Sequence, residues 1–225
     1  MNNTHYCLFS NNLFDFSHTI AASLLQRHKY PWEVLAEISD FIFALAPTLD
    51  LTVYTDTGNG IYIAKDAIIA PSANIQGPCI ICPGAEIRHC AFIRGSVIVG
   101  ANAVVGNSTE LKNSILFDCV QVPHYNYVGD SILGYKSHLG AGAITSNVKS
   151  DKSPVCIKGD GFAIETGRKK VGAMVGDYTE VGCGAVLCPG TVIGKHTTVY
   201  PLVRVRGAVP ENCIVKSENV YITKA

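Results

Sequence analysis

Large apolar side chains recur at every sixth position along much of this chain. The first run is Ile63, Ile69, Ile75, Ile81, Ile87, Ile93, Val99, Val105, Leu111 and Phe117. A period of six matches neither an α-helix, which repeats about every 3.6 residues, nor a strand, which repeats about every 2.0. It is typical of hexapeptide repeats, in which short strands turn and stack coil on coil as a parallel β-helix.

Two interruptions divide the repeat. The period runs from Ile61 to Phe117, which predicts a little over three triangular coils without a slip, and then breaks at 123–127. A longer break at 146–174 contains apolar residues on both sides of 159–161, which predicts a hairpin excursion. The second run is Val175, Val181, Leu187, Ile193, Val199 and Val205.

The first fifty-five residues lack the period. Ser17 is expected to cap one helix, and Pro31 is expected to begin a second. We expect this segment to act as a helical cap or packing element, since the end of a β-helix exposes unpaired backbone groups. The predicted organisation is a helical N-terminal segment at 1–55, an all-β helical domain at 56–209 with a loop excursion at 146–174, and a tail at 210–225.

Composition narrows the possible partners and location. With 18 basic and 18 acidic residues, the zero net charge gives no support for general nucleic-acid or membrane binding. No secretory signal pattern is present at the N-terminus, and no stretch is long enough to span a bilayer. The odd number of cysteines, nine, then favours a cytoplasmic protein with reduced thiols. Cys79 and Cys82 have CxxC spacing, but buried structural thiols are the favoured interpretation.

Loops at the two interruptions are where a site could be built. His124 has the chemistry of a general base, although an exposed loop histidine is the simpler alternative. Asn147 could bind a ligand or satisfy a turn. Arg94 and Lys112 lie one predicted coil apart, so they should stack and repel unless an anion such as phosphate lies between them. A solvated charged face is the alternative, and nearby Glu110 weakens the repulsion argument.

These residues carry a resemblance. Together with the stretches 124–130 and 140–147, they resemble the acetyltransferase domain of the bifunctional glucosamine-1-phosphate acetyltransferase/N-acetylglucosamine-1-phosphate uridyltransferase family, over roughly residues 60–210. The whole chain is also similar to stand-alone proteins labelled as related to UDP-N-acetylglucosamine pyrophosphorylase. The resemblance implies a left-handed parallel β-helix, a homotrimer with sites between neighbouring prisms, and acetyl-CoA as the donor.

The resemblance also implies residue roles at the reacting centre. His124 would be the general base toward the sugar amine, and Asn147 would help to position that amine. The backbone N–H of Ala141 would stabilise the oxyanion. Cys183 falls where the family has a serine near the coenzyme, and Lys149 and Lys152 are further candidates for coenzyme contact.

Substrate contacts follow from the same match. Arg94 and Lys112 would hold the sugar phosphate and Tyr127 the sugar, with Glu110 as a supporting partner. His138 stands where a family member has an asparagine that touches the substrate, so substrate identity is open. The loop at 146–174 resembles the archaeal members more than the bacterial ones.

The favoured function is therefore an acetyl-CoA-dependent N-acetyltransferase acting on an amino-sugar phosphate without a metal. The family's pyrophosphorylase domain is absent here, so uridyl transfer is not expected. One alternative is a non-catalytic sugar-phosphate or nucleotide-sugar binding or assembly module on the same scaffold. Another is a zinc enzyme like the γ-class carbonic anhydrases, whose three-histidine spacing is not matched by His89, His124 and His138. The sugar, the acyl group and the pathway stay open.

Overall fold

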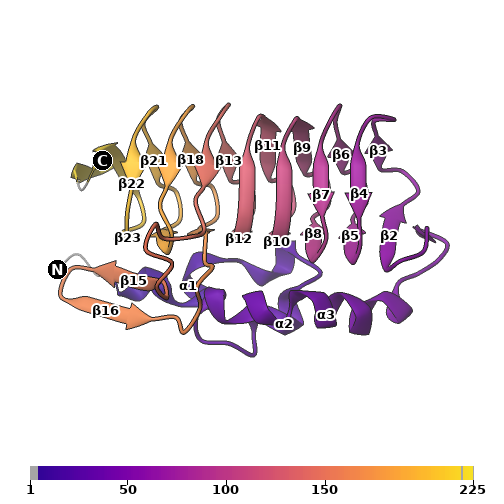
Figure 1. Cartoon of the computed structure of the whole chain (residues 1–225), viewed down its shortest axis with the longest axis horizontal. Helices are drawn as coiled ribbons and strands as arrows, with labels where there is room; N and C mark the ends of the chain where they lie inside the picture. The colour runs from indigo at the N-terminus through magenta and orange to yellow at the C-terminus, as the bar shows by residue number, and fades with distance from the viewer. Residues whose placement is uncertain (1–4, 219, 225) are drawn as a thin grey trace.

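Short parallel strands wind around a three-sided prism in the computed structural model, which describes residues 5–218 and 220–224 (Figure 1). Successive coils pair in parallel, and few helices are present. The fold is the left-handed parallel β-helix of hexapeptide repeats that the sequence predicts.

The three faces of the prism differ in what covers them. The front face in Figure 1 carries β4 (Asn74–Gln76), β7 (Phe92–Arg94), the first parts of β10 (Glu110–Leu116) and β12 (Tyr127–Leu133), β14 (Ile144–Thr145), β19 (Val186–Leu187) and β22 (Arg204–Val205). The rear face carries β3 (Ile68–Ile69), β6 (Glu86–Ile87), β9 (Val104–Asn107), β11 (Gln121–His124), β13 (His138–Leu139), β18 (Glu180–Val181), β21 (Thr198–Val199) and β24 (Cys213–Ser217). The helix-covered face carries β2 (Ile61–Ala64), β5 (Cys79–Ile81), β8 (Val97–Val99), the second parts of β10 and β12, β17 (Ala173–Val175), β20 (Thr191–Ile193) and β23 (Ala208–Val209).

Antiparallel strands lie at both ends of the solenoid. β1 (Tyr54–Asp56) pairs with β2, and β25 (Val220–Thr223) pairs with β24. One face of each end coil therefore pairs with a short strand of opposite direction rather than with the helical segment.

The coil length changes in the middle of the prism. Ile61 pairs with Cys79, eighteen positions on, but Leu111 pairs with Val128, only seventeen positions on. Leu116, not Phe117, lies opposite Val99. The predicted unbroken period to Phe117 was therefore wrong by one residue. The predicted break at 123–127 was also wrong, because the stretch from Val122 to Tyr127 is as long as the stretch from Val105 to Glu110 on the coil below. The reason is that β10 turns its corner with one residue fewer, through Asn113 in the left-handed conformation (φ 48°).

The N-terminal segment lies along the helix-covered face (Figure 1). On this face the outward-pointing side chains, which alternate with those lining the prism interior, are fully buried beneath the N-terminal segment. They are Ile80, Ile98, Ile115, Ile132, Met174 and Val192. Phe117 belongs to this outer layer as well, because its ring packs on Phe14 with centroids 5.0 Å apart. The segment is thus a packing element along the side of the solenoid and not a cap over its end.

The helical segment is more broken than the sequence suggests. Its elements are η1 (Tyr6–Leu8), α1 (Ser10–Leu13), η2 (Phe16–His18), α2 (Ala22–Leu25), η3 (Pro31–Ala36), α3 (Ile38–Leu45) and η4 (Ala46–Thr48). The predicted Ser17 cap was wrong, because Asp15 accepts the Ser17 N–H at 3.0 Å. The helix predicted from Pro31 begins as 3-10 turns before α3. Burial on the prism face, rather than helix length, stabilises these pieces.

The predicted hairpin is present in the longer break. β15 (Cys156–Gly159) pairs antiparallel with β16 (Phe162–Glu165). The excursion leaves after Asn147 and returns at Val171, whose N–H donates to the Asn147 carbonyl at 3.0 Å. The coils resume in register, since Leu133 pairs with Val175.

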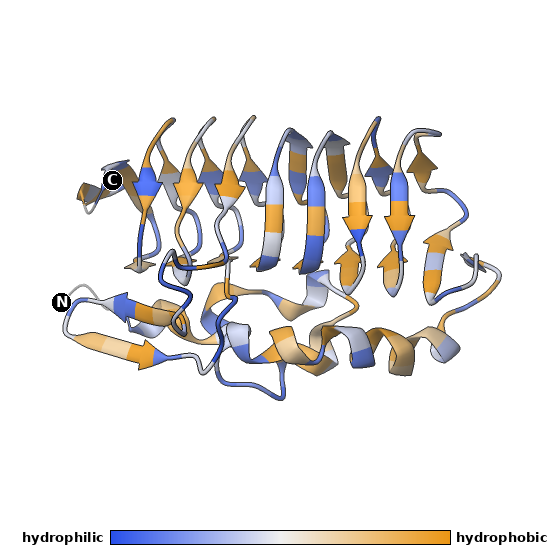
Figure 2. Cartoon of the chain, viewed as in Figure 1, coloured by the Kyte–Doolittle hydropathy of each residue, from blue (hydrophilic) through white to orange (hydrophobic). Residues whose placement is uncertain are grey.

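Hydropathy follows this architecture. Figure 2 shows apolar stretches on the strands and along the N-terminal helices, and a polar loop leading to β15. Cys79 and Cys82 are buried, and burial raises the pKa of each thiol to about 12, which favours the structural interpretation of the CxxC spacing. Among residues 5–218 and 220–224, no helix combines the length and apolar character needed to cross a membrane.

Ile98→Ala tests the packing of the helical segment on the prism. Ile98 is fully buried between β8 and the helices, so the truncation leaves a cavity. We expect the free energy of unfolding to fall by about 2–5 kcal/mol in chemical denaturation. Leu51→Ala, at a residue 62% exposed, is the control and should change it by less than about 0.5 kcal/mol. Equal effects of the two changes would contradict this packing.

Candidate functional site

The corner between the rear and front faces is a stack of main-chain turns. The Gly142 N–H donates to the His124 carbonyl at 3.0 Å, and the Gly184 N–H donates to the Ala141 carbonyl at 2.8 Å. His124, Ala141 and Cys183 are all exposed on this corner. The structure therefore brings three of the sequence-predicted residues together on successive coils.

Asn126 fixes this corner from inside. Its buried amide nitrogen donates to the carbonyls of Gly140 (2.8 Å) and Ala143 (2.9 Å), and its amide oxygen accepts the His124 N–H at 3.1 Å. The side chain thus ties the turn containing His124 to the turn containing Ala141. The Ala141 N–H donates no hydrogen bond to any residue that the structure describes, so it is available to an external acceptor.

The predicted cations lie on the front face, on adjacent coils. The pairing of Ile93 with Leu111 gives Arg94 and Lys112 the same register position. Each has a carboxylate partner: Arg94 Nη1 lies 2.6 Å from Glu110 Oε1, and Lys112 Nζ lies 3.5 Å from Asp130 Oδ2. The predicted need for an external anion between the stacked cations was therefore wrong, because two carboxylates of the chain already relieve their repulsion.

Glu110 holds Arg94 in place and keeps it charged. Their hydrogen bond raises the pKa of the Arg94 guanidinium. The Arg94 side chain is 42% exposed, so its remaining donors face solvent and can still bind an anion in a forked geometry.

A polar network occupies the corner between the front and helix-covered faces. Asp130 Oδ1 accepts from Asn113 Nδ2 at 2.9 Å, and Asp130 Oδ2 accepts from Asn147 Nδ2 at 2.5 Å. Asn147 Nδ2 also donates to the Tyr127 hydroxyl at 3.2 Å. Burial raises the pKa of the Tyr127 phenol, so this side chain keeps its proton at neutral pH. Tyr127 and Asn147 are therefore brought together as predicted, along the same front face as Lys112.

His138 lies apart from this network within one chain. It is on the rear face, where its Nδ1 lies 2.9 Å from Glu180 Oε2 in a cavity of about 510 Å³. The structure does not bring His138 together with Arg94, Lys112 or Tyr127 in a single prism.

The two lysines of the excursion that are candidates for coenzyme contact lie in different surroundings. Lys149 Nζ donates to Ser153 Oγ at 2.5 Å and lines a cavity with Lys158 and Arg206. Lys152 is exposed on a turn with φ 56°. Lys149 therefore belongs to a cationic pocket, whereas Lys152 does not line it.

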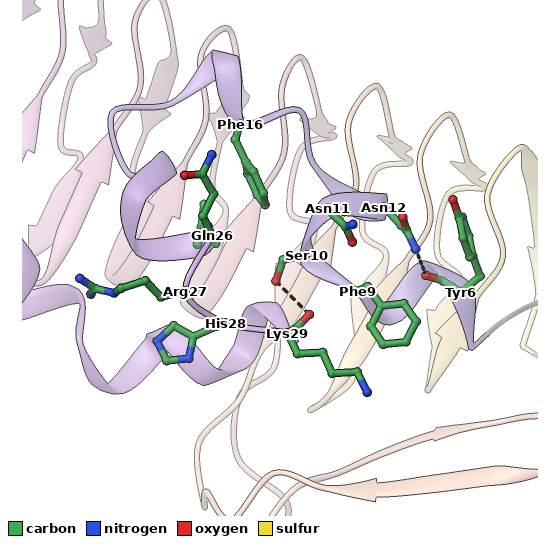
Figure 3. Close-up of a pocket in the computed structure, with 11 residues that line it drawn as sticks. Tyr6, Phe9, Ser10, Asn11, Asn12, Phe16, Gln26, Arg27, His28 and Lys29 are labelled. Carbon is green, nitrogen blue, oxygen red and sulfur yellow. Dashed lines mark hydrogen bonds between the residues drawn. The ribbon is translucent and has the colours of Figure 1, made fainter.

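A large cavity in the N-terminal segment does not contain the predicted chemistry. It has about 800 Å³ and lies in the N-terminal segment between α1 and α2, where Figure 3 shows its lining side chains. Its basic residues are already engaged: Arg27 and His28 both contact Glu37, and Lys29 lies over the Phe9 ring. We therefore place the candidate site on the corner and front face and not in this larger cavity.

Three residues of the two corners were not predicted as site residues from the sequence: Asn113, Asn126 and Asp130. A signal for two of them exists, because Asn113, Asp130 and Asn147 are spaced by seventeen residues, the observed coil length. Asparagine and aspartate are also enriched in the left-handed conformation that corners require. Asn126 gave no such signal, since its burial depends on the turn it fills.

The arrangement offers a base, a main-chain donor and two cations, which suits acyl transfer to an anionic acceptor. No group of three or more His, Cys, Asp or Glu side chains that could hold a metal ion lies within 5–218 and 220–224.

The chain is similar to several known proteins. A family model described as the GMPPB C-terminal domain matches residues 75–175. The chain is 34% identical over 200 residues to the bifunctional protein GlmU of Methanococcus maripaludis, covering 87% of this chain and 48% of that protein. It is 33% identical over 141 residues to a bifunctional sugar-1-phosphate nucleotidylyltransferase/acetyltransferase of Sulfurisphaera tokodaii, covering 63% and 35%. The chain spans about half the length of the first of these relatives and a smaller share, 35%, of the second.

A solved structure also matches. PerB from Caulobacter crescentus, in complex with CoA and GDP-perosamine, covers 68% of this chain and 52% of that chain, with 19% identity and a TM-score of 0.33.

Asn126→Ala tests the internal brace of the corner. The change removes three hydrogen bonds and leaves the Ala143 carbonyl without a donor among the described residues, whereas the Gly140 carbonyl keeps the Ala143 N–H. We expect the unfolding free energy to fall by about 1–3 kcal/mol, because unsatisfied buried groups keep their desolvation cost. Hydrogen exchange of the Gly142 amide should accelerate at the same time. Asn74→Ala, an exposed change on β4, is the control, and unchanged exchange at Gly142 in Asn126→Ala would contradict the brace.

Proposed function

Because the chain belongs to the hexapeptide-repeat acyltransferase family of the GlmU acetyltransferase domain, we propose that it is an acetyl-CoA-dependent N-acetyltransferase acting on an amino-sugar phosphate. The observation that carries the proposal is the joining of His124 and the unengaged Ala141 N–H on one corner by Asn126. Arg94, Lys112, Tyr127 and Asn147 on the adjoining front face supply contacts for a phosphorylated sugar.

His124 acts as the general base. Its imidazole is exposed and makes no hydrogen bond within the described chain, so it is open to a substrate amine. The amine is mostly protonated at neutral pH, so it first releases one proton to solvent, and His124 then takes a second proton as the neutral amine attacks the thioester carbonyl. A carbon–nitrogen bond forms, the carbon–sulfur bond breaks, and His124 returns the proton to the departing thiolate. The Ala141 N–H donates to the negative charge that develops on the carbonyl oxygen.

Arg94 and Lys112 bind the phosphate of the acceptor sugar. Arg94 presents a planar fork that matches two phosphate oxygens, and Glu110 keeps this fork in place. Tyr127 contacts the sugar ring from the same face, and the Asn147 amide lies beside it. An unphosphorylated sugar would lack the charged contacts and bind more weakly.

The coenzyme runs from Cys183, on the rear–front corner, across the front face to the corner between β22 and β23. The cationic pocket of Lys149, Lys158 and Arg206 fits its phosphates, because two of these cations, Lys158 and Arg206, form no ion pair among the described residues. Lys152 stands at the exposed turn beside this pocket.

A homotrimer completes the site. His138 and its partner Glu180 lie on the rear face, whereas the phosphate-binding residues lie on the front face. Within one prism His138 and Arg94 lie on different faces, but the rear face of a neighbouring copy placed against the front face would bring such residues together. Sedimentation equilibrium of the purified chain tests this assembly.

His124→Ala tests the assignment of the base. We expect turnover with acetyl-CoA, read by release of free thiol, to fall by about 10²–10⁴-fold, because the proton on the attacking amine then has no positioned acceptor. The unfolding free energy should change little at this exposed site. His196→Ala is the matched control, since His196 is an exposed corner histidine that stacks on Tyr178 at another corner. Undiminished turnover in His124→Ala would refute the assignment.

Arg94→Met tests the phosphate site. We expect KM for glucosamine-1-phosphate to rise by about 10–100-fold, the scale of a lost charged hydrogen bond, with little effect on KM for acetyl-CoA. Arg88→Met is the matched control, because Arg88 pairs with Glu86 at 3.0 Å with similar exposure but lies on the rear side. If both changes raise KM equally, the phosphate lies elsewhere.

A further inference from the structure

Three corner side chains form a column one above the other. Lys112 pairs with Gly129 and Ser114 with Ser131, so Asn113 and Asp130 stack at the corner between these pairs. Asn147 follows seventeen positions later, where the excursion leaves the prism. Asp130, in the middle, has a side chain only 3% exposed. A carboxylate buried this deeply must be satisfied by hydrogen bonds or opposite charge.

Asp130 dictates which way its neighbours point. An ionised carboxylate only accepts hydrogen bonds, so it must face the NH₂ end of each amide. It accepts from Asn113 Nδ2 on one oxygen and from Asn147 Nδ2 on the other, and Lys112 Nζ lies 3.5 Å from that second oxygen. The Asn147 NH₂ group is then used up by Asp130 and the Tyr127 hydroxyl. Its carbonyl oxygen accepts no hydrogen bond from the described residues and is turned away from Asp130.

We propose that Asp130 is a positioning residue that orients Asn147 to present a hydrogen-bond acceptor to the acceptor-sugar amine, and that anchors Lys112 beside it. This inference rests on the proposed function. An amine that is about to attack carries N–H donors, so a fixed oxygen beside it aligns the lone pair toward the thioester. An NH₂ group in the same place would repel those donors.

The N-terminal segment sets the direction of this column. Asn113 Nδ2 also donates to the main-chain carbonyl of Leu35, in η3, at 3.1 Å. The carbonyl oxygen of Leu35 is an obligatory acceptor, so Asn113 must turn its NH₂ group toward both Leu35 and Asp130. The helical segment therefore fixes the orientation of an amide two coils away, a role beyond covering the prism.

Asp130→Asn tests the proposal with an isosteric change. Asn113 still presents NH₂ to residue 130, so the new amide turns its oxygen to Asn113 and its NH₂ group to Asn147. Asn147 must then flip and present NH₂ to the substrate. We expect kcat to fall by about 10–100-fold, with KM for acetyl-CoA within about threefold of the wild type. An unchanged kcat would overturn the proposal.

Exchanging the residues at positions 130 and 147 distinguishes an orienting role of Asp130 from simple structural support. In the double variant Asp130→Asn with Asn147→Asp, the amide at 130 donates to the carboxylate at 147, whose other oxygen is again an acceptor. We expect this variant to recover about tenfold of the kcat lost in Asp130→Asn, a coupling that independent sites do not show. A double variant no faster than Asp130→Asn would overturn the proposal.

Asp177→Asn is the matched control. Asp177 is also a buried corner carboxylate, 1% exposed, with two main-chain donors and Lys195 at 3.0 Å, but it lies at another corner. It should lose stability as Asp130→Asn does while keeping kcat. If Asp177→Asn lowers kcat equally, the effect at Asp130 is merely structural.

A readout independent of activity separates this inference from the proposed function. By NMR, the Asn147 side-chain amide protons should exchange slowly in the wild type and faster in Asp130→Asn. Rapid exchange in an active wild type overturns the inference alone. Slow exchange in a wild type that acetylates none of the amino-sugar phosphates supports the orientation and overturns the proposed function.

Discussion

Parallel main-chain hydrogen bonds between coils decide which residues of this protein meet. A side chain touches the residues one coil above and below it, so its neighbours lie sixteen to eighteen positions away, or forty-two across the excursion, rather than nearby in sequence. Arg94 and Lys112, or Asn113 and Asp130, are neighbours for this reason alone. The site is therefore a product of register, and one residue more or less in a coil would assemble a different set of side chains.

The architecture could be predicted because the hexapeptide period records burial directly. Ile93 or Val99 must be apolar at its position whatever lies elsewhere, so the pattern predicts the coils and the interruption at 146–174. The shortening at Asn113 could not be predicted this way, since Leu116 and Phe117 are both apolar and both buried. The first lines the prism and the second packs on Phe14, and only the three-dimensional partner distinguishes them.

Candidate site residues could be predicted where the residue type itself suggests a chemical role, and could not be predicted where the role depends on three-dimensional neighbours. His124 and the front-face cations stand out as residue types, and family resemblance ordered them. Their carboxylate partners changed the interpretation, because Glu110 and Asp130 relieve the charge that had suggested a bound anion. Asn126 acts only through the turn it fills, so nothing in the residue itself distinguishes it from an ordinary loop asparagine.

The closing hydrogen bond of the excursion has a broader consequence. Val171 donates to Asn147, so the two ends of the 148–170 stretch are held side by side by the solenoid itself. The entropy of closing such a loop grows only slowly with its length. Segments of different length and chemistry could therefore be exchanged at the Asn147 corner while the strands on either side keep their register. Such an exchange would change the surface beside Asn147 and leave the corner that holds His124 and Ala141 unchanged.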